Sequence, residues 1–439
     1  MAMVVKNNMS ALSTLNTLNK NTKALSKSLQ KVSSGMKINS AADDASGYAI
    51  SERMCVQIRS LDQANSNAQN GGSMMKVAEG AVSSTVEILK TLKEKAVNAA
   101  NDTNTDADRQ TIQKELDQSI DQINDNANVT FNGQYLVDGS KNSKNNGTST
   151  ALTNQSLSTD TASNTALTAL KARNGDKLNI QATDTVTVSW VKDGKTYTAS
   201  TEVGSTNSLS TIIAGLADGS HNLSSDVKFG SNTSYIEIDG SKNTVYTASG
   251  ESAITITSTG TGIENQISGF TISITDNTGA VRKSANAALD AFDETLRAQN
   301  NSLDNSINLQ IGAKANQTIK VGLTDMKAQA LGLQGANNET IQVGNQKQAN
   351  AAINVLDAAI QKALDQQTTI GAVQSRLEYT QSNLTTASEN VTAAESTIRD
   401  ADMAKEMTEY TKNNVLMQAA QSMLAQANQS SSNVLSLLQ

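Results

Sequence analysis

Few side chains in this sequence are of the kinds that carry out catalysis or bind metals. His221 is the only histidine, so neither a His-x-x-x-His pair nor an HExxH zinc site can exist. It lies in the polar stretch Asp218-Gly-Ser-His-Asn, which predicts an exposed turn. Cys55 is the only cysteine, which excludes an intrachain disulfide. Its place one residue after the apolar position Met54 predicts partial burial rather than a reactive thiol.

Two other patterns look like functional motifs but have simpler explanations. The glycines of Thr259-Gly-Thr-Gly indicate strand turns, since no GxxxxGK[ST] phosphate loop follows them. The adjacent carboxylates Asp43 and Asp44 precede a helix, whose N-terminal end favours negative charge. Serine and threonine are abundant between residues 140 and 283, where their hydroxyls are acceptors for O-glycosylation. We therefore predict a protein that is not an enzyme and has no cofactor or metal.

The composition restricts the partners. The chain has 439 residues and a formal net charge of -7, which argues against nucleic acid or an anionic membrane as the main partner. It contains no proline, so long uninterrupted helices are allowed. No apolar run reaches the length of a membrane-spanning helix, and membrane insertion is not expected. The start, Met1-Ala-Met-Val-Val-Lys, lacks the apolar stretch of a secretory signal, so no cleaved signal peptide is expected.

Long helices are expected at both ends of the chain. From Leu356 onward every seventh residue is apolar, which predicts a coiled-coil strand. These positions are Leu356, Ala363, Ile370, Leu377, Leu384, Val391 and Ile398. Residues 413–439 contain no charged side chain, which predicts that this tail becomes buried.

The helix expected over residues 4–36 has a similar apolar stripe. Its positions step by four and three, and they are Val4, Asn8, Ala11, Leu15, Leu18, Thr22, Leu25, Leu29, Val32 and Met36. Lysines lie off this stripe, no acidic residue precedes Asp43, and Gly35 is a candidate C-cap. We predict that residues 4–36 pair with the uncharged tail. An ordinary intramolecular helix face is the alternative reading of the stripe alone.

Between the termini the pattern changes from helices to strands. Helices are expected from Ile50 to Ala99 and from Ile112 to about Asn128. Alternating segments from Ser140 to about Lys283 predict an inserted domain with its own core. Its expected elements are a hairpin at Asp193-Gly194, strands beginning at Tyr235, Ile254 and Phe270, and helices at Leu167–Ala172 and Leu209–Leu216. A helix at Ala285–Gln299 and a hairpin pairing residues 307–311 with 319–323 follow.

The expected fold is therefore mainly α at both termini, where N- and C-terminal segments form a long coiled-coil helical bundle. A β-hairpin and an inserted α+β, β-rich outer domain complete it.

Segments at both ends resemble the bacterial flagellins, the filament subunits of the flagellum. The N-terminal match comprises Leu29-Gln-Lys-Val-Ser-Ser-Gly-Met-Lys-Ile-Asn-Ser-Ala-Ala-Asp-Asp-Ala-Ser-Gly, Ile50-Ser-Glu-Arg-Met, Ala78-Glu-Gly-Ala and Phe131-Asn-Gly. The C-terminal match comprises Ile370-Gly-Ala-Val-Gln-Ser-Arg-Leu, Ala394-Glu-Ser-Thr-Ile-Arg-Asp-Ala-Asp-Met-Ala, Leu424-Ala-Gln-Ala-Asn-Gln and Asn433-Val-Leu-Ser-Leu-Leu-Gln.

The resemblance implies a structural subunit that self-assembles into the motility filament. Residues 1–42 with 400–439 would be terminal helices of the inner filament core, 43–140 with 296–399 a coiled-coil rod domain, and 141–295 a variable outer surface domain. It also implies export, unfolded and uncleaved, through the flagellar secretion channel. The implied partners are other copies, a flagellar secretion chaperone, and the filament cap and hook-junction proteins. A hook–filament junction protein shares the terminal coils and is the alternative.

Two sets of site residues follow from the resemblance. The polymerisation seam comprises Val4, Leu15, Leu18, Leu25, Leu29, Val32, Met403, Met407, Leu416, Met423, Leu424, Val434, Leu435 and Leu438. Contacts with the vertebrate Toll-like receptor 5 are implied at Leu89, Lys90, Thr91, Lys93, Glu94, Ala96, Ile112 and Glu115. Well-recognised flagellins carry arginine in place of Thr91 and leucine in place of Lys95. A threonine cannot supply a guanidinium, so we expect weakened binding and still weaker signalling.

Overall fold

The computed structural model describes residues 8–218, 221–230, 235–247 and 251–437, with residues 431 and 433–437 described by their backbone alone. The chain forms two compact units. The first contains Met1–Ala68, Gln310–Gln317 and Tyr379–Gln439, and the second contains Gln69–Leu309 and Thr318–Glu378. Two long helices, α2 (Ala45–Ala99) and α7 (Gln346–Arg399), contribute residues to both.

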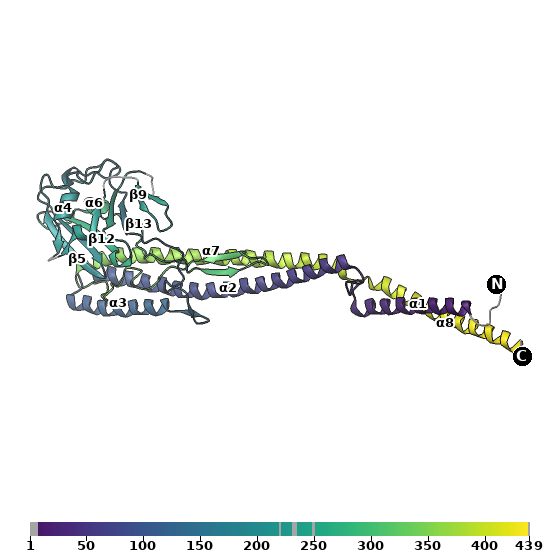
Figure 1. Ribbon diagram of the computed structural model, residues 1–439. Helices are drawn as coiled ribbons and strands as arrows, with labels where there is room; N and C mark the ends of the chain where they lie inside the picture. The colour runs from purple at the N-terminus through teal and green to yellow at the C-terminus, as the bar shows by residue number, and fades with distance from the viewer. Residues whose placement is uncertain (1–7, 219–220, 231–234, 248–250, 438–439) are drawn as a thin grey trace. The chain divides into compact units, whose positions relative to one another are not determined.

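In the first unit, α1 (Met9–Ser34) and α8 (Met403–Leu437) lie side by side as an antiparallel pair, here called the α1–α8 pair (Figure 1). Gly35 ends α1 in the left-handed conformation with φ of 73°, and its N–H donates to the Lys31 carbonyl. The expectation of a glycine C-cap is thereby confirmed. Just beyond it, the Lys37 N–H donates to the Arg399 carbonyl at 2.8 Å and the Ala401 N–H donates to the Gly35 carbonyl at 2.9 Å.

The two carboxylates before α2 act as helix-start groups. Asp44 Oδ1 accepts from the backbone N–H groups of Ser46 and Gly47, both at 3.0 Å. Asp43 Oδ2 accepts from the N–H groups of two residues in the preceding turn. The Asp44 bonds satisfy donors that the start of α2 leaves unpaired, and the Asp43 bonds hold the turn before it. Both support the interpretation of Asp43 and Asp44 as local structure.

In the second unit, residues 69–99 of α2, all of α3 (Asp106–Ala127) and residues 346–378 of α7 form what we call the helical core. Its apolar positions are closed to solvent: Leu89, Leu116 and Leu356 are each 0% exposed. A capping box joins Thr105 and Asp108 at the start of α3. Arg109 closes the turn by donating from Nε to the Ala99 carbonyl at 2.9 Å.

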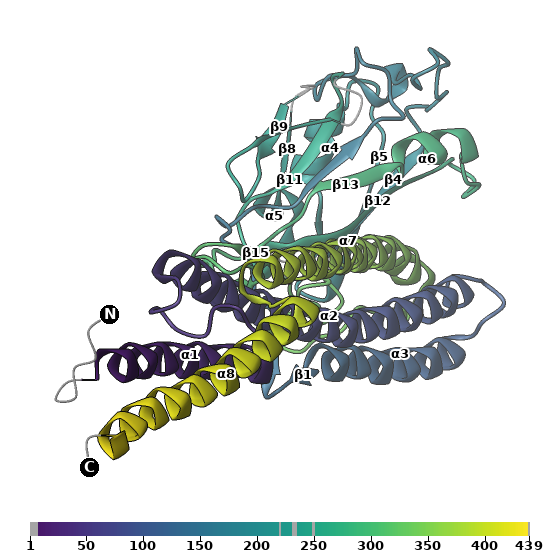
Figure 2. The ribbon, with the colours of Figure 1, turned by 90° about the vertical axis from the view of Figure 1, so that its right-hand side faces the viewer.

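The inserted region of this unit contains two main sheets, seen beside α7 in Figure 2. One has the order β12-β4-β5, with β4 (Thr185–Lys192), β5 (Lys195–Glu202) and β12 (Ile267–Thr275) all antiparallel. Asp193 and Gly194 join β4 to β5 with φ of 53° and 75°, the positive values that a type I′ hairpin requires. The predicted Asp-Gly hairpin is confirmed.

The second sheet has the order β13-β3-β11-β8. Its strands are β3 (Ala151–Asn154), β8 (Val227–Phe229), β11 (Ile254–Ser258) and β13 (Phe292–Leu296). Smaller ladders pair β1 (Thr130–Phe131) with β2 (Gln134–Tyr135), β6 (Ala217–Asp218) with β7 (His221–Asn222), β9 (Tyr235–Ile238) with β10 (Thr244–Tyr246), and β14 (Ile307–Gln310) with β15 (Thr318–Val321).

Short helices complete the inserted region. They are η1 (Leu167–Ala169), α4 (Leu209–Gly215), α5 (Leu223–Asp226), η2 (Ile263–Asn265) and α6 (Lys283–Leu289). The two main sheets and these helices enclose one apolar cluster around Trp190, which is 0% exposed. A strand glycine lets β12 approach α7 closely, because a Cβ at Gly269 would lie 2.7 Å from Val355 Cγ2.

The expected fold class is confirmed, with two local corrections. The helix predicted at Ala285–Gln299 ends at Leu289, and β13 replaces its second half. β13 pairs with β3, whose backbone is buried and needs ladder partners on this side, so tertiary pairing outweighs the local helix preference. The helix predicted at Leu167–Ala172 is only the 3-10 turn η1.

Candidate assembly surface and other candidate sites

The contact inside the α1–α8 pair is made by small and polar side chains. Of the side chains described in these two helices, only Ser28 and Ala420 are buried. Amide groups bridge the helices: Asn413 Nδ2 donates to Ser28 Oγ at 3.0 Å, and Asn8 Nδ2 donates to the Ala427 carbonyl at 3.2 Å. Lys31 Nζ lies 3.3 Å from Glu406 Oε1. The pair therefore has no apolar core of its own among its described side chains.

The large apolar side chains of the pair point away from this contact. Nine of them, here called the outward patch, are between 41% and 68% exposed: Met9, Leu12, Leu15, Leu29, Met403, Met407, Val415, Leu416 and Met423. Monomeric proteins rarely leave large apolar side chains gathered on one surface, and such patches mark interaction sites.

The predicted seam positions divide between the two faces. Leu15, Leu29, Met403, Met407, Leu416 and Met423 belong to the outward patch. The other described seam positions, Leu18, Leu25, Val32 and Leu424, are half-buried. Val4 and Leu438 lie outside the described residues, and Val434 and Leu435 are described only as helical backbone.

The face that α1 turns toward α8 differs from the predicted stripe. The sequence places Leu15, Thr22 and Leu29 on the stripe, whereas the structure turns Thr14, Asn21 and Ser28 inward instead. Asn21 Nδ2 donates to the Leu416 carbonyl at 3.2 Å, a bond that only a polar residue at this position can make. α1 thus contacts α8, whereas Leu15 and Leu29 of the stripe are 41% and 52% exposed.

His221 lies in β7 and is not a free turn residue. Its Nε2 lies 2.7 Å from Asp226 Oδ2, and its ring stacks on Tyr197 with centroids 4.3 Å apart. Asp226 also accepts from Trp190 Nε1 at 3.1 Å and from Lys192 Nζ at 2.7 Å. The prediction of an exposed turn is wrong for His221, because it is half-buried in β7 against a carboxylate that needs donors. The cluster ties β4 and β5 to β7.

Cys55 is half-buried, as the sequence predicts. Its Sγ lies 3.7 Å from Glu395 Oε1 and 3.9 Å from Arg399 Nη1. Arg399 Nη1 also lies 2.9 Å from Glu52 Oε1 and thereby joins α7 to α2. The cysteine is thus a bystander in an ion-pair group that connects two helices.

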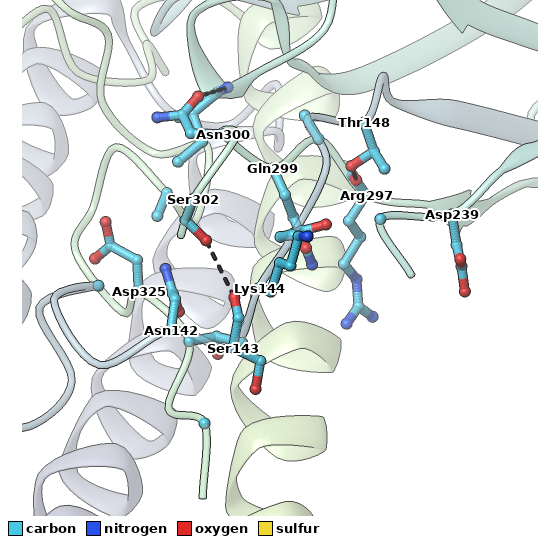
Figure 3. A pocket seen from close by; sticks show the side chains of 18 of the residues that line it. Asn142, Ser143, Lys144, Thr148, Asp239, Arg297, Gln299, Asn300, Ser302 and Asp325 are labelled. Atoms are coloured by element: carbon cyan, nitrogen blue, oxygen red, sulfur yellow. Dashed lines mark hydrogen bonds between the residues drawn. The ribbon is translucent and has the colours of Figure 1, made fainter. Parts of the chain in front are cut away.

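A polar cavity of about 420 Å³ lies between the two segments that enter and leave the inserted region and α7 (Figure 3). Ser302 Oγ donates to the Ser143 carbonyl at 3.1 Å, and Thr148 Oγ1 donates to the Arg297 carbonyl at 2.6 Å. These bonds join the two segments. Within the part of the chain that the structure describes, no group of histidine, cysteine or acidic residues is placed to hold a metal.

Charged side chains beside this cavity neutralise one another. Arg297 lies 3.2 Å from Glu294 and 2.6 Å from Asp365, while Lys362 Nζ donates to the Ala330 carbonyl. Burial lowers the pKa of Lys362 and raises the pKa of Glu294. This group was not predicted from the sequence. Lys362 was a signal for it, because it follows Ala359 by three residues on the buried face of a heptad helix. Its role in the structure is to connect β13 with α7.

The implied receptor-contact residues do not share one exposed face. Leu89 and Ala96 are both 0% exposed in the helical core, so no partner can touch them without opening it. Their inclusion is corrected by the heptad packing of α2, which turns both inward. Lys90, Thr91, Glu94 and Glu115 are exposed, whereas Lys93 and Ile112 are half-buried.

Each lysine of this region is paired with an acidic side chain. Lys90 Nζ lies 2.8 Å from Glu87, Lys93 pairs with Asp357, and Lys95 Nζ lies 2.9 Å from Glu115. Of the helices in the described ranges, none is long and apolar enough to cross a bilayer.

Comparisons with known proteins cover almost the whole chain. The bacterial flagellin N-terminal helical region matches residues 5–142, and the C-terminal helical region matches residues 353–438. A flagellin of Clostridium tyrobutyricum is 36% identical over 97% of this chain and 99% of its own length. A flagellin of Bacillus subtilis is 30% identical over 99% of this chain and 100% of its own length. A flagellar filament core protein of Treponema phagedenis is 28% identical over 99% and 100%.

Proposed function

Because this chain belongs to the bacterial flagellins, the structural subunits of the flagellar filament, we propose that the outward patch is the surface through which its copies polymerise. The single observation that carries the proposal is the exposure of nine large apolar side chains on a helix pair whose own contact is polar. The full-length relatives named flagellin favour this role over that of a hook–filament junction protein.

The expected gain from covering the patch is large enough to drive assembly. Burying the exposed half of a leucine or methionine side chain contributes about 1 kcal/mol. Nine such side chains together contribute on the order of 10 kcal/mol before the entropy of association is subtracted. The outward patch does not include the buried contact residues Ser28 and Ala420, so neighbours can cover its exposed side chains without displacing α8 from α1.

Contacts of this kind extend into a filament when they are not self-complementary. A head-to-tail contact that does not close produces an open helical polymer. We propose that residues 1–42 with 400–439 form the innermost layer, 43–140 with 296–399 the surrounding layer, and 141–295 the outer surface. In this arrangement the half-buried seam residues Leu18, Leu25, Val32 and Leu424 add to the polar contact within the pair. Val4, Val434, Leu435 and Leu438 remain proposed members of the polymerisation seam.

The same role implies partners before and during assembly. We propose that a flagellar secretion chaperone covers the α8 face of the patch in the cytosol, since an exposed apolar helix face invites premature association. Export then proceeds unfolded through the flagellar channel without a cleaved signal. The filament cap and the hook-junction proteins contact the same terminal helices at the two ends of the polymer.

Removing residues 413–439 tests the assembly surface. We expect the truncated chain not to elongate filament seeds, because α1 loses most of its partner helix and the patch loses Val415, Leu416 and Met423. Electron microscopy of seeded protein measures this outcome. Fluorescence of Trp190, the only tryptophan, checks that the inserted region remains folded. Normal filaments from the truncated chain would refute the proposal.

A second proposal concerns the vertebrate Toll-like receptor 5. The exposed face offers Thr91 rather than the arginine of well-recognised flagellins, and Lys95 is paired with Glu115. We propose weak receptor binding and weaker signalling. In a reporter-cell assay, Thr91→Arg combined with Lys95→Leu should raise potency, with Lys76→Leu, an exposed position elsewhere on α2, as the control. Potency of the unchanged protein equal to that of an enteric flagellin would contradict the proposal.

A further inference from the structure

Methionine is distributed unevenly between the surface and the interior. Of the methionines that the structure describes, the exposed ones are Met9, Met403, Met407 and Met423, and all four belong to the outward patch. In contrast, Met74, Met75 and Met326 of the second unit are buried. Solvent-accessible thioether groups are thus concentrated on the surface that we assign to assembly.

The four sulfur atoms lie toward both ends of the α1–α8 pair. Met9 follows Asn8, whose amide donates to the carbonyl of Ala427, one turn beyond Met423. At the other end, Met403 and Met407 flank Glu406, which pairs with Lys31. A neighbouring subunit that covers either end of the patch therefore meets at least one thioether.

Oxidation would change the chemistry of this surface. Hydrogen peroxide transfers one oxygen atom to a thioether sulfur and leaves as water, so the sulfur is oxidised by two electrons and the peroxide is reduced by two. The resulting sulfoxide is polar and accepts hydrogen bonds. In the free subunit it remains hydrated. In an apolar contact it must be desolvated without a matching donor, which disfavours the contact.

We propose that Met9, Met403, Met407 and Met423 form a peroxide-sensitive modification site that controls incorporation of the subunit. Oxidation of the free chain blocks its addition to a filament, and incorporation in turn shields the four sulfur atoms. Methionine sulfoxide reductases reverse the block, with one reductase for each sulfoxide epimer: two thiols supply two electrons and two protons and become a disulfide, and the oxygen leaves as water. This inference rests on the proposed assembly role of the outward patch.

The test uses the full chain carrying Cys55→Ser, which removes thiol oxidation, alongside the unchanged chain. Free subunits are treated with hydrogen peroxide, the sulfoxide at each methionine is measured by peptide mass spectrometry, and untreated seeds are then added. We expect the four exposed methionines to oxidise while Met74 stays reduced. Elongation should slow by roughly tenfold or more. Treatment with both sulfoxide reductases should restore it.

Matched variants separate the patch from other methionines. A chain with all four exposed methionines changed to leucine keeps an apolar surface, so it should elongate equally with and without peroxide. The control, Met36→Leu with Met54→Leu, changes half-buried methionines off the patch and should remain sensitive. Equal sensitivity of the fourfold variant and the parent would overturn the proposal.

Four further outcomes are decisive. If chains whose four methionines are oxidised elongate at the untreated rate, the proposal is overturned. It is also overturned if the reductases fail to restore elongation of the oxidised parent chain. Both tests hold even where the fourfold variant does not fold. Assembled filaments should oxidise at these positions several-fold more slowly than free subunits, and equal rates would overturn the shielding. Normal elongation, without any peroxide, by a chain carrying Leu15→Gln and Leu416→Gln would instead refute the assembly role itself.

Discussion

The helical core and the α1–α8 pair carry similar apolar repeats but pack them differently. In the helical core the heptad positions face partner helices and are closed to solvent, as Leu89 and Leu356 show at 0% exposed. In the pair, Leu29 and Met423 stand 52% and 64% exposed while serine, alanine and asparagine line the contact. A repeat of apolar residues thus specifies that a surface will be buried, but its partner can be in the same chain or in another one.

The exposed fraction of the heptad positions changes along α7, from the values of the helical core toward those of the α1–α8 pair. Ile370 and Leu377 are 0% exposed, Leu384 is 8% exposed, and Val391 and Ile398 are only half-buried. The same heptad series therefore becomes less completely buried toward its C-terminal end. We infer that the need for contacts from other copies begins before α8, in the last turns of α7.

The largest difference between the two regions should appear in the stability of the free subunit. Leu92→Ala in the helical core should lower the free energy of unfolding by about 2–5 kcal/mol, because Leu92 is 1% exposed and its loss leaves a cavity. Leu29→Ala on the outward patch should change it by less than about 0.5 kcal/mol. Denaturant unfolding followed by circular dichroism measures both. Equal losses of unfolding free energy at Leu92 and Leu29 would contradict the distinction between the helical core and the outward patch.

The opposite order should hold for assembly. Leu15→Gln with Leu416→Gln should raise the critical concentration for polymerisation on the order of tenfold per position, because each polar amide replaces apolar contact area. The free subunit should unfold as before. Sedimentation of filaments at graded protein concentrations gives the value. The control is Thr17→Gln with Thr411→Gln, at exposed polar positions of the same helices. It should leave the critical concentration unchanged.

The smallest effect concerns the start of α3. Hydrogen bonds from the side chain and backbone of Thr105 hold the pKa of Asp108 below its ordinary value of 3.8. The ionised carboxylate therefore stabilises the folded chain above pH 3.8, and this contribution is lost as the pH falls through the lowered folded-state pKa. Asp108→Asn should slightly lower the thermal midpoint at neutral pH and have no effect at pH values below that pKa. A constant difference across pH would show that the charge is not involved.

Much of the fold could be predicted because it depends on local patterns. The Asp193-Gly194 dipeptide predicts its hairpin since few other residues accept two positive φ values. The helical core follows from the heptads for the same local reason. By contrast, β13 could not be predicted, because Phe292 to Leu296 become a strand only by pairing with residues far away in the sequence.

The candidate site was harder to predict than the fold. The terminal helices were recognisable, but the face of α1 that meets α8 is decided by Asn413 and Ala420 on the other helix. Likewise, Lys362 meets Glu294 and Arg297 beside the cavity although it lies far from them in the sequence. Patterns along the chain predict which residues are apolar, and distant partners decide which of them remain outside.

The backbone hydrogen bonds at Gly35 and Ala401 give α1 and α8 a common origin. Away from that point residue numbers fall along α1 and rise along α8. In each helix one residue advances by about 1.5 Å and turns by about 100°. Every subunit therefore presents its outward side chains at the same heights and the same phase. One inserted residue in either helix would shift every side chain beyond it by about 1.5 Å and about 100° relative to the other helix.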